Sequence, residues 1–138
     1  MHRAATVAIA VLIAMFAIAA APPAMASTTA SCTSTSVYWD MIGFSVNLPT
    51  IGHNTHRDNC LLGVGNQSSA VTALQVALSH CYRRIAIDGV FGPQTEAALR
   101  YAQKSAHIPA DGVYGPQTRD HIQWYDSFTY CAPLHPPA

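Results

Sequence analysis

The chain has 138 residues, of which 50% are hydrophobic and only 10% are charged, with seven basic and seven acidic side chains. That length suffices for one modest domain but not for a large enzyme. A balanced charge gives no basic footprint of the kind that nucleic-acid-binding proteins show, so we expect no nucleic-acid partner.

Residues 1–26 have the order of features of a secretory signal peptide. Arg3 precedes an almost purely apolar run from Ala4 to Ala21, two prolines follow, and Ala24-Met25-Ala26 gives a small-x-small cleavage site. We predict cleavage after Ala26 and export of residues 27–138 to the cell wall or the medium. The alternative is an uncleaved anchor, since the run approaches the length of a membrane span. We expect contact with a membrane only through this segment, before cleavage.

Residues 27–60 differ in composition from the rest of the chain. They are rich in Ser, Thr and Asn, they show no helical period, and they contain β-favouring pieces at residues 36–39 and 44–48. We predict an irregular N-terminal extension, with room for a hairpin, that is held between Cys32 and Cys60.

The four cysteines predict two disulfides, because an even count in a short exported chain is typical of a disulfide framework. We favour Cys32–Cys60 and Cys81–Cys131, which close two separate loops, but the crossed pairings stay open. A zinc site of four cysteines is disfavoured, since the chain has no Cys-x-x-Cys pair. We therefore predict no metal and no cofactor.

An internal repeat organises the second half of the chain. Asp88–Thr95 recurs as Asp111–Thr118, 23 residues later, with seven of eight positions identical. Asp followed by Gly favours a turn, because the carboxylate accepts nearby backbone N–H groups and Gly tolerates positive φ. Gly92 and Gly115 then stand at helix N-cap positions, with Pro at the first helical position after each. Each repeat is predicted to be a turn that starts a helix.

The spacing of apolar residues predicts three short amphipathic helices, the second ending near Ala106. Helices this short need one another, so we predict a mainly α fold: a small three-helix bundle over residues 61–131, followed by a flexible Pro-rich tail, 132–138. The helical positions are Val71, Leu74, Gln75 and Leu78; Thr95, Ala98, Leu99 and Ala102; and Thr118, His121, Ile122 and Tyr125.

These motifs, in this order and spacing, resemble the peptidoglycan-binding domain 1 family over about residues 61–125 of the chain. The resemblance implies a three-helix fold in a secreted bacterial protein, which binds the glycan or the stem peptide of peptidoglycan without cleaving it. Family members commonly accompany cell-wall hydrolases, which are therefore expected partners. The motifs are Val71-x-x-Leu74-Gln75-x-x-Leu78, Asp88-Gly89-x-Phe91-Gly92-x-x-Thr95-x-x-Ala98-Leu99, Gln103, and Asp111-Gly112-x-x-Gly115-x-x-Thr118.

The repeat also supplies the candidate ligand-binding residues, each with a structural alternative. For the two aspartates, the turn-forming role is favoured over ligand contact. The first aromatic is expected to pack inside and the second, a tyrosine, to contact ligand at the surface. The two glycines expose N–H groups that suit a stem-peptide carboxylate. The candidates are Asp88, Phe91, Gly92, Asp111, Tyr114 and Gly115.

Further polar and aromatic residues lie near the repeats. Gln75 and Gln103 stand on apolar helix faces, so we predict that they are buried and hydrogen-bonded to loop groups. An aromatic edge of Tyr101, Trp124 and Tyr125 is a weaker candidate, with core packing as the default.

Two other functions stay open. His53, His56 and Asp58 could ligate zinc and make a small hydrolase, but they lie in a polar loop with no supporting helix, and Arg57 adds unfavourable charge. The chain could instead be a secreted inhibitor or partner of a cell-wall enzyme. We expect a stand-alone binding module that is not an enzyme.

Overall fold

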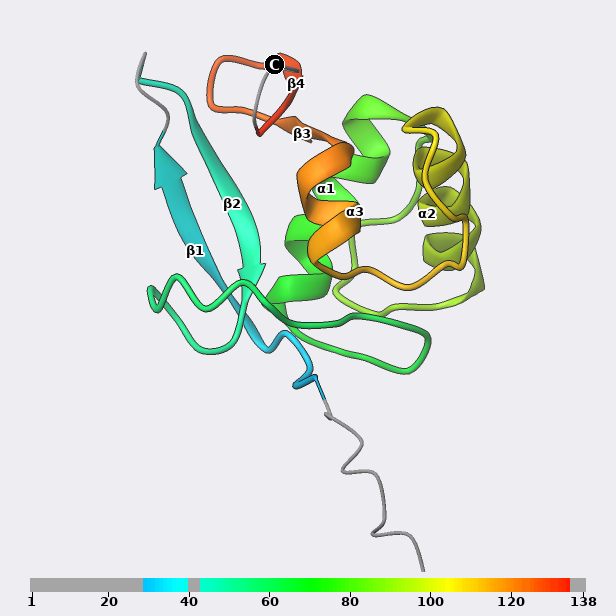
Figure 1. Ribbon diagram of the computed structural model, residues 1–138, viewed down its shortest axis with the longest axis horizontal. Coiled ribbons are helices and arrows are strands. Elements are labelled where there is room, and N and C mark those ends of the chain that lie inside the picture. The colour runs from blue at the N-terminus through cyan, green and yellow to red at the C-terminus, as the bar shows by residue number, and fades with distance from the viewer. Residues whose placement is uncertain (1–28, 40–42, 135–138) are drawn as a thin grey trace, which may run out of the picture.

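The computed structural model describes residues 29–39 and 43–134 (Figure 1). The predicted leader, 1–26, lies outside the described residues. Within the described ranges, none of the helices has the length and apolar character needed to cross a lipid bilayer. The elements are β1 (Ser34–Trp39), β2 (Ser45–Thr50), α1 (Ser69–Cys81), α2 (Pro93–Ser105), α3 (Pro116–His121), β3 (Gln123–Tyr125) and β4 (Cys131–Pro133).

The prediction of a mainly α three-helix bundle with an irregular extension is wrong. Two antiparallel two-stranded sheets accompany the three helices, β1 with β2 and β3 with β4. The extension forms the β1–β2 hairpin, paired from Ser34↔Thr50 to Trp39↔Ser45, and it includes most of the two β-favouring pieces. Side chains alternate between the two faces of each strand, and one face of the hairpin buries Ser36 and Leu48 in the protein. This burial explains why the extension is ordered.

The third helix is much shorter than its spacing predicts. α3 ends at His121, and Ile122 is already extended, with φ −82° and ψ 162°. The chain continues as β3, which pairs with β4 from Gln123↔Pro133 to Tyr125↔Cys131. β4 therefore includes two residues of the predicted flexible tail, whereas residues 135–138 lie outside the described residues.

The two disulfides have the favoured pairing. Cys32 is bonded to Cys60 and Cys81 to Cys131, with sequence separations of 28 and 50 residues. The first closes the hairpin segment and the second ties the end of α1 to β4. In the chain-entropy model, loops of these lengths contribute about 4 kcal/mol each.

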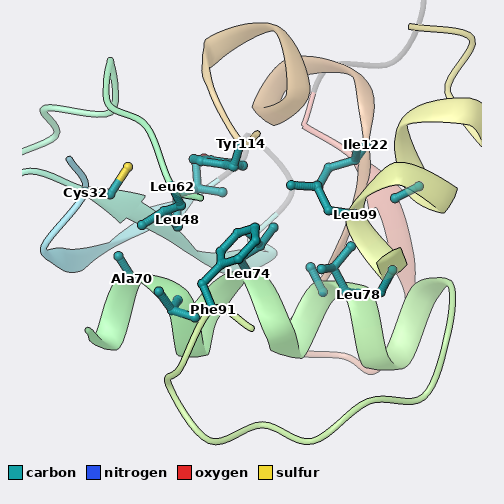
Figure 2. Close-up of a cluster of buried hydrophobic side chains, with 14 of the residues drawn as sticks. Cys32, Leu48, Leu62, Ala70, Leu74, Leu78, Phe91, Leu99, Tyr114 and Ile122 are labelled. Carbon is teal, nitrogen blue, oxygen red and sulfur yellow. The ribbon is translucent and has the colours of Figure 1, made fainter. Parts of the chain in front are cut away.

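One hydrophobic core joins the hairpin to the helices. Figure 2 shows that buried side chains from segments far apart in the sequence, from Cys32 to Ile122, gather along α1. The helix contributes Leu74 and Leu78, the hairpin Leu48, and α2 Leu99, all essentially inaccessible to solvent. The hairpin is therefore part of the same folded unit as the helices.

Candidate functional site

The first Asp-Gly turn is held by a buried glutamine on α1. Gln75 Oε1 accepts the N–H groups of Asp88 (3.1 Å) and Gly89 (2.8 Å). Its Nε2 lies 2.9 Å from Asp88 Oδ1, 3.0 Å from the carbonyl of Val90 and 3.1 Å from Thr95 Oγ1. One side chain thereby ties the turn to both helices that flank it.

The second turn repeats this arrangement with Gln103 of α2. Its Nε2 lies 2.8 Å from Asp111 Oδ1, 3.0 Å from the Val113 carbonyl and 3.1 Å from Thr118 Oγ1. Its Oε1 accepts the N–H of Gly112 at 2.9 Å. The prediction that both glutamines are buried and bonded to loop groups is confirmed. We call each Gln–Asp–Gly arrangement a glutamine latch.

The turns use their own hydrogen-bonding groups internally. Asp88 Oδ1 also accepts the Val90 N–H at 2.9 Å. The hydrogen bond from this N–H lowers the pKa of the Asp88 carboxyl most, and the hydrogen bond from the Gln75 amide lowers it further. The N–H of Gly92 donates to the Val90 carbonyl at 3.0 Å, so it is not free for a ligand carboxylate. The favoured turn-forming role of the aspartates accounts for these contacts.

The two equivalent aromatic residues both face the core. Phe91 is buried, as predicted, but Tyr114 is 0% exposed, so its predicted surface position is wrong (Figure 2). Within the described residues, the Tyr114 hydroxyl has no hydrogen-bond partner. Burial raises the pKa of this hydroxyl far above its ordinary value, against an opposing effect of Arg119.

The three residues of the predicted aromatic edge each contact a different neighbour. Trp124 is buried and donates from Nε1 to the Arg119 carbonyl at 2.9 Å. The half-buried Tyr125 ring stacks on His80 with centroids 4.0 Å apart. Tyr101, on α2, lies instead under the guanidinium of Arg83, 4.3 Å from its ring centroid.

The loop that carries His53, His56 and Asp58, here called the histidine loop, does not bring these three side chains together. Among the described residues, which include His53, His56 and Asp58, no three His, Cys, Asp or Glu side chains are placed to hold an ion. Asp58 Oδ1 pairs with Arg119 at 2.9 Å, and Oδ2 accepts from Tyr38 at 3.2 Å. Burial is the main cause that raises the pKa of Tyr38 to about 12, and the negative charge of Asp58 is the second. The loop joins the hairpin to α3, and the zinc hypothesis loses its support.

A groove of about 320 Å³ lies where the hairpin, α1 and β3 meet. We call it the hairpin groove. Five lining residues come from the flank of α1, two from the hairpin and two from β3. The lining residues are Thr35, Asn47, Ser69, Thr72, Ala73, Val76, Ala77, Trp124 and Tyr125.

The hairpin groove combines hydroxyl, amide, aliphatic and aromatic groups and has no charged side chain in its lining. Such a mixture suits a neutral, partly polar ligand. Sequence analysis missed it, because Thr35, Asn47 and Thr72 belong to no motif and come from separate segments. The one available signal was the spacing of Thr35, Val37 and Trp39 by two residues, which predicts that they share one face of a strand.

The helical part of the chain has a family match. Residues 67–122 match the model of a family described as a putative peptidoglycan binding domain. The chain belongs to this family. The peptidoglycan-binding segment, 67–122, includes all three helices and both Asp-Gly turns, whereas β1, β2, β3 and β4 lie outside it.

Two crystal structures are similar to the chain. The SleB N-terminal domain is 34% identical, with 44% of this chain and 85% of that one covered, at a TM-score of 0.43. A peptidoglycan-binding protein from Clostridioides difficile, in complex with glutamine hydroxamate, is 26% identical. The match covers 62% of this chain and 54% of that one, at a TM-score of 0.48. None of the curated proteins matches the chain.

Proposed function

We propose that the chain is an exported, non-catalytic protein that binds bacterial cell-wall peptidoglycan. The observation that carries this proposal is the family match over residues 67–122. The two disulfides support export, because such bonds persist in oxidising compartments. Support for binding without cleavage comes from the repeat, whose Asp and Gln side chains are engaged with one another.

Of the six predicted contact residues, the carboxylates of Asp88 and Asp111 are exposed and therefore accessible to the wall. Their charge can be removed with little change in shape by the double substitution Asp88→Asn and Asp111→Asn. The amide keeps an oxygen that accepts the Val90 or Val113 N–H. Reduced retention by the wall, in a variant that circular dichroism shows to be folded under the assay conditions, supports ligand contact at the turns. Unchanged retention restricts both aspartates to a role in the fold.

The test of the function is co-sedimentation of the exported, oxidised protein with purified, protein-free peptidoglycan sacculi. We expect intact sacculi to retain the protein and soluble wall fragments to compete for it. Chromatography of the supernatant checks the non-catalytic part, because no new soluble fragments should accumulate. Absence of retention overturns the proposed binding, and release of fragments overturns its non-catalytic character. Mass spectrometry of the exported product tests the leader, since cleavage after Ala26 gives a chain beginning at Ser27.

A further inference from the structure

We propose that the hairpin groove is a glycan-binding site that takes a short stretch of β-linked N-acetylated hexoses, and that the exposed Trp39 extends it as a stacking platform. The inference rests on the proposed function in one respect, which is that the cell wall supplies this glycan. It names the glycan rather than the stem peptide as the part recognised.

The register of the hairpin places the groove and Trp39 on one face. Residues two apart on a strand share a face, so Thr35, Val37 and Trp39 form a row on β1. Asn47 is paired with Val37 and lies on the same side. Thr35 and Asn47 line the hairpin groove, and the row continues from them to Trp39 over about 13 Å. That length accommodates several consecutive sugar rings.

The exposure along this row increases away from the core. Val37 is 39% exposed and Trp39 is 71% exposed. The opposite face of the hairpin faces the core with Leu48 and Ser36, so burial does not account for an indole held in the open. A hexose has a face of C–H groups and an edge of hydroxyls, and an exposed indole supplies a flat apolar surface for the former.

The groove also supplies polar groups for the edge of a sugar. The side chains of Thr35, Asn47 and Ser69 make no hydrogen bond within the described ranges, which leaves their hydroxyl and amide groups available. An N-acetyl group pairs one donor and one acceptor with these groups and places its methyl against Val76 or Ala73.

The charge of the lining favours the glycan over the stem peptide. Peptide carboxylates bind most strongly to Arg or Lys, and no such residue lines the groove. Four of the lining residues, Thr35, Asn47, Trp124 and Tyr125, lie outside the peptidoglycan-binding segment. The hairpin and β3 therefore add neutral lining residues to the flank of α1. In Figure 1 the hairpin and α2 lie on opposite sides of α1.

The experiment titrates the exported protein with a β-1,4-linked N-acetylglucosamine tetrasaccharide, followed by calorimetry, beside the sacculus assay. We expect saturable binding that Trp39→Ala weakens roughly tenfold and Asn47→Ala weakens less. Tyr130→Ala is the matched control, because Tyr130 is an aromatic residue with 68% exposure that does not line the groove, and its loss should leave the affinity unchanged. Circular dichroism and thermal unfolding check that each variant folds.

The outcomes separate this inference from the proposed function. Retention by sacculi without tetrasaccharide binding, with stem peptide as the competitor, overturns the glycan site and leaves wall binding intact. Tetrasaccharide binding without retention by sacculi overturns wall binding and supports a glycan of the same chemistry from another source. Binding that Trp39→Ala and Asn47→Ala leave unchanged overturns the assignment to the hairpin groove, and absence of both kinds of binding overturns both proposals.

Discussion

The two Asp-Gly repeats share seven of eight residues, yet a helix of 13 residues follows one and a helix of six follows the other. Both turns have a glutamine latch with nearly the same distances, and in both a proline begins the helix. The start of each helix is therefore the same. The difference arises downstream, where each helix finds its partners.

α2 continues because Leu99 and Ala102 remain buried. The chain after α3 instead leaves as β3, pairs with β4 and returns to α1 through Cys81–Cys131. The repeat thus sets where a helix begins, while tertiary contacts set where it ends. Three pairs of substitutions test how far the two repeats are equivalent, and Asp88→Asn tests the charge in the first repeat.

The largest effect is expected from removing either latch. Gln75→Ala leaves two turn N–H groups without their acceptor and Gln103→Ala leaves one, and each substitution opens a cavity where a buried side chain stood. Each should cost about 3 kcal/mol in the free energy of unfolding. Gln75 should cost more, because it accepts two turn N–H groups whereas Gln103 accepts one. Urea unfolding of the oxidised protein measures both.

The matched control for the latches is Gln94→Ala, an exposed glutamine in the first turn of α2, which should stay within about 0.5 kcal/mol of the parent. Equal, small losses for all three variants would contradict a structural role for the latches.

The N-cap glycines should respond differently to the same change. A Cβ at Gly92 meets nothing within 4 Å, whereas a Cβ at Gly115 comes to 3.0 Å from Leu61 Cδ2. Both residues have negative φ, so backbone strain is not the difference. We expect Gly115→Ala to cost about 1.5 kcal/mol more than Gly92→Ala, as an overpacked contact. Thermal unfolding of the two variants side by side measures this, and equal losses would argue against the contact.

The aromatic position offers a reciprocal exchange. Tyr114→Phe removes a buried hydroxyl that has no partner in the described part of the chain, and it should stabilise the protein by about 1 kcal/mol. Phe91→Tyr introduces a hydroxyl at the equivalent buried position and should lower the stability of the protein. Denaturant midpoints of the two variants test the exchange, and a loss of stability in Tyr114→Phe would show that the hydroxyl is bonded in solution.

Sequence reasoning succeeded where local chemistry decides the structure. The Asp-Gly turns and the helix starts at Pro93 and Pro116 follow from residues a few positions apart. The engaged glutamines follow from their place on apolar helix faces, although their partners lie 8 to 20 residues away. The end of α3 and the order of the hairpin depend on distant contacts, such as the N–H of Ser127 donating to the Ser45 carbonyl at 3.1 Å. The surface position predicted for Tyr114 was wrong because its hydroxyl shows that the side chain is polar but does not decide whether it is buried. The hairpin groove was missed because its walls come from three separated segments.

The smallest effect concerns the charge in the first latch. The pKa of Asp88 is lowered by the Val90 N–H and the Gln75 amide, so the folded state holds its proton less tightly than the unfolded state does. The charged carboxylate therefore contributes stability above the unfolded value of about 4, and this contribution is lost as the pH falls through the lower folded value. Asp88→Asn should accordingly be less stable than the parent at pH 7, with a difference that narrows from pH 4 downward. The effect should be modest, because Asp88 is exposed.

Urea unfolding of the parent and of Asp88→Asn between pH 7 and pH 2.5 measures this difference. Asn keeps the oxygen that accepts the Val90 N–H, so the comparison isolates the charge from the hydrogen bond. A difference that stays constant over the whole range would show that the carboxylate acts only through its shape. A narrowing difference, beside the larger loss of stability in Gln75→Ala, would show that the amide provides most of the latch and the charge a smaller part that depends on pH.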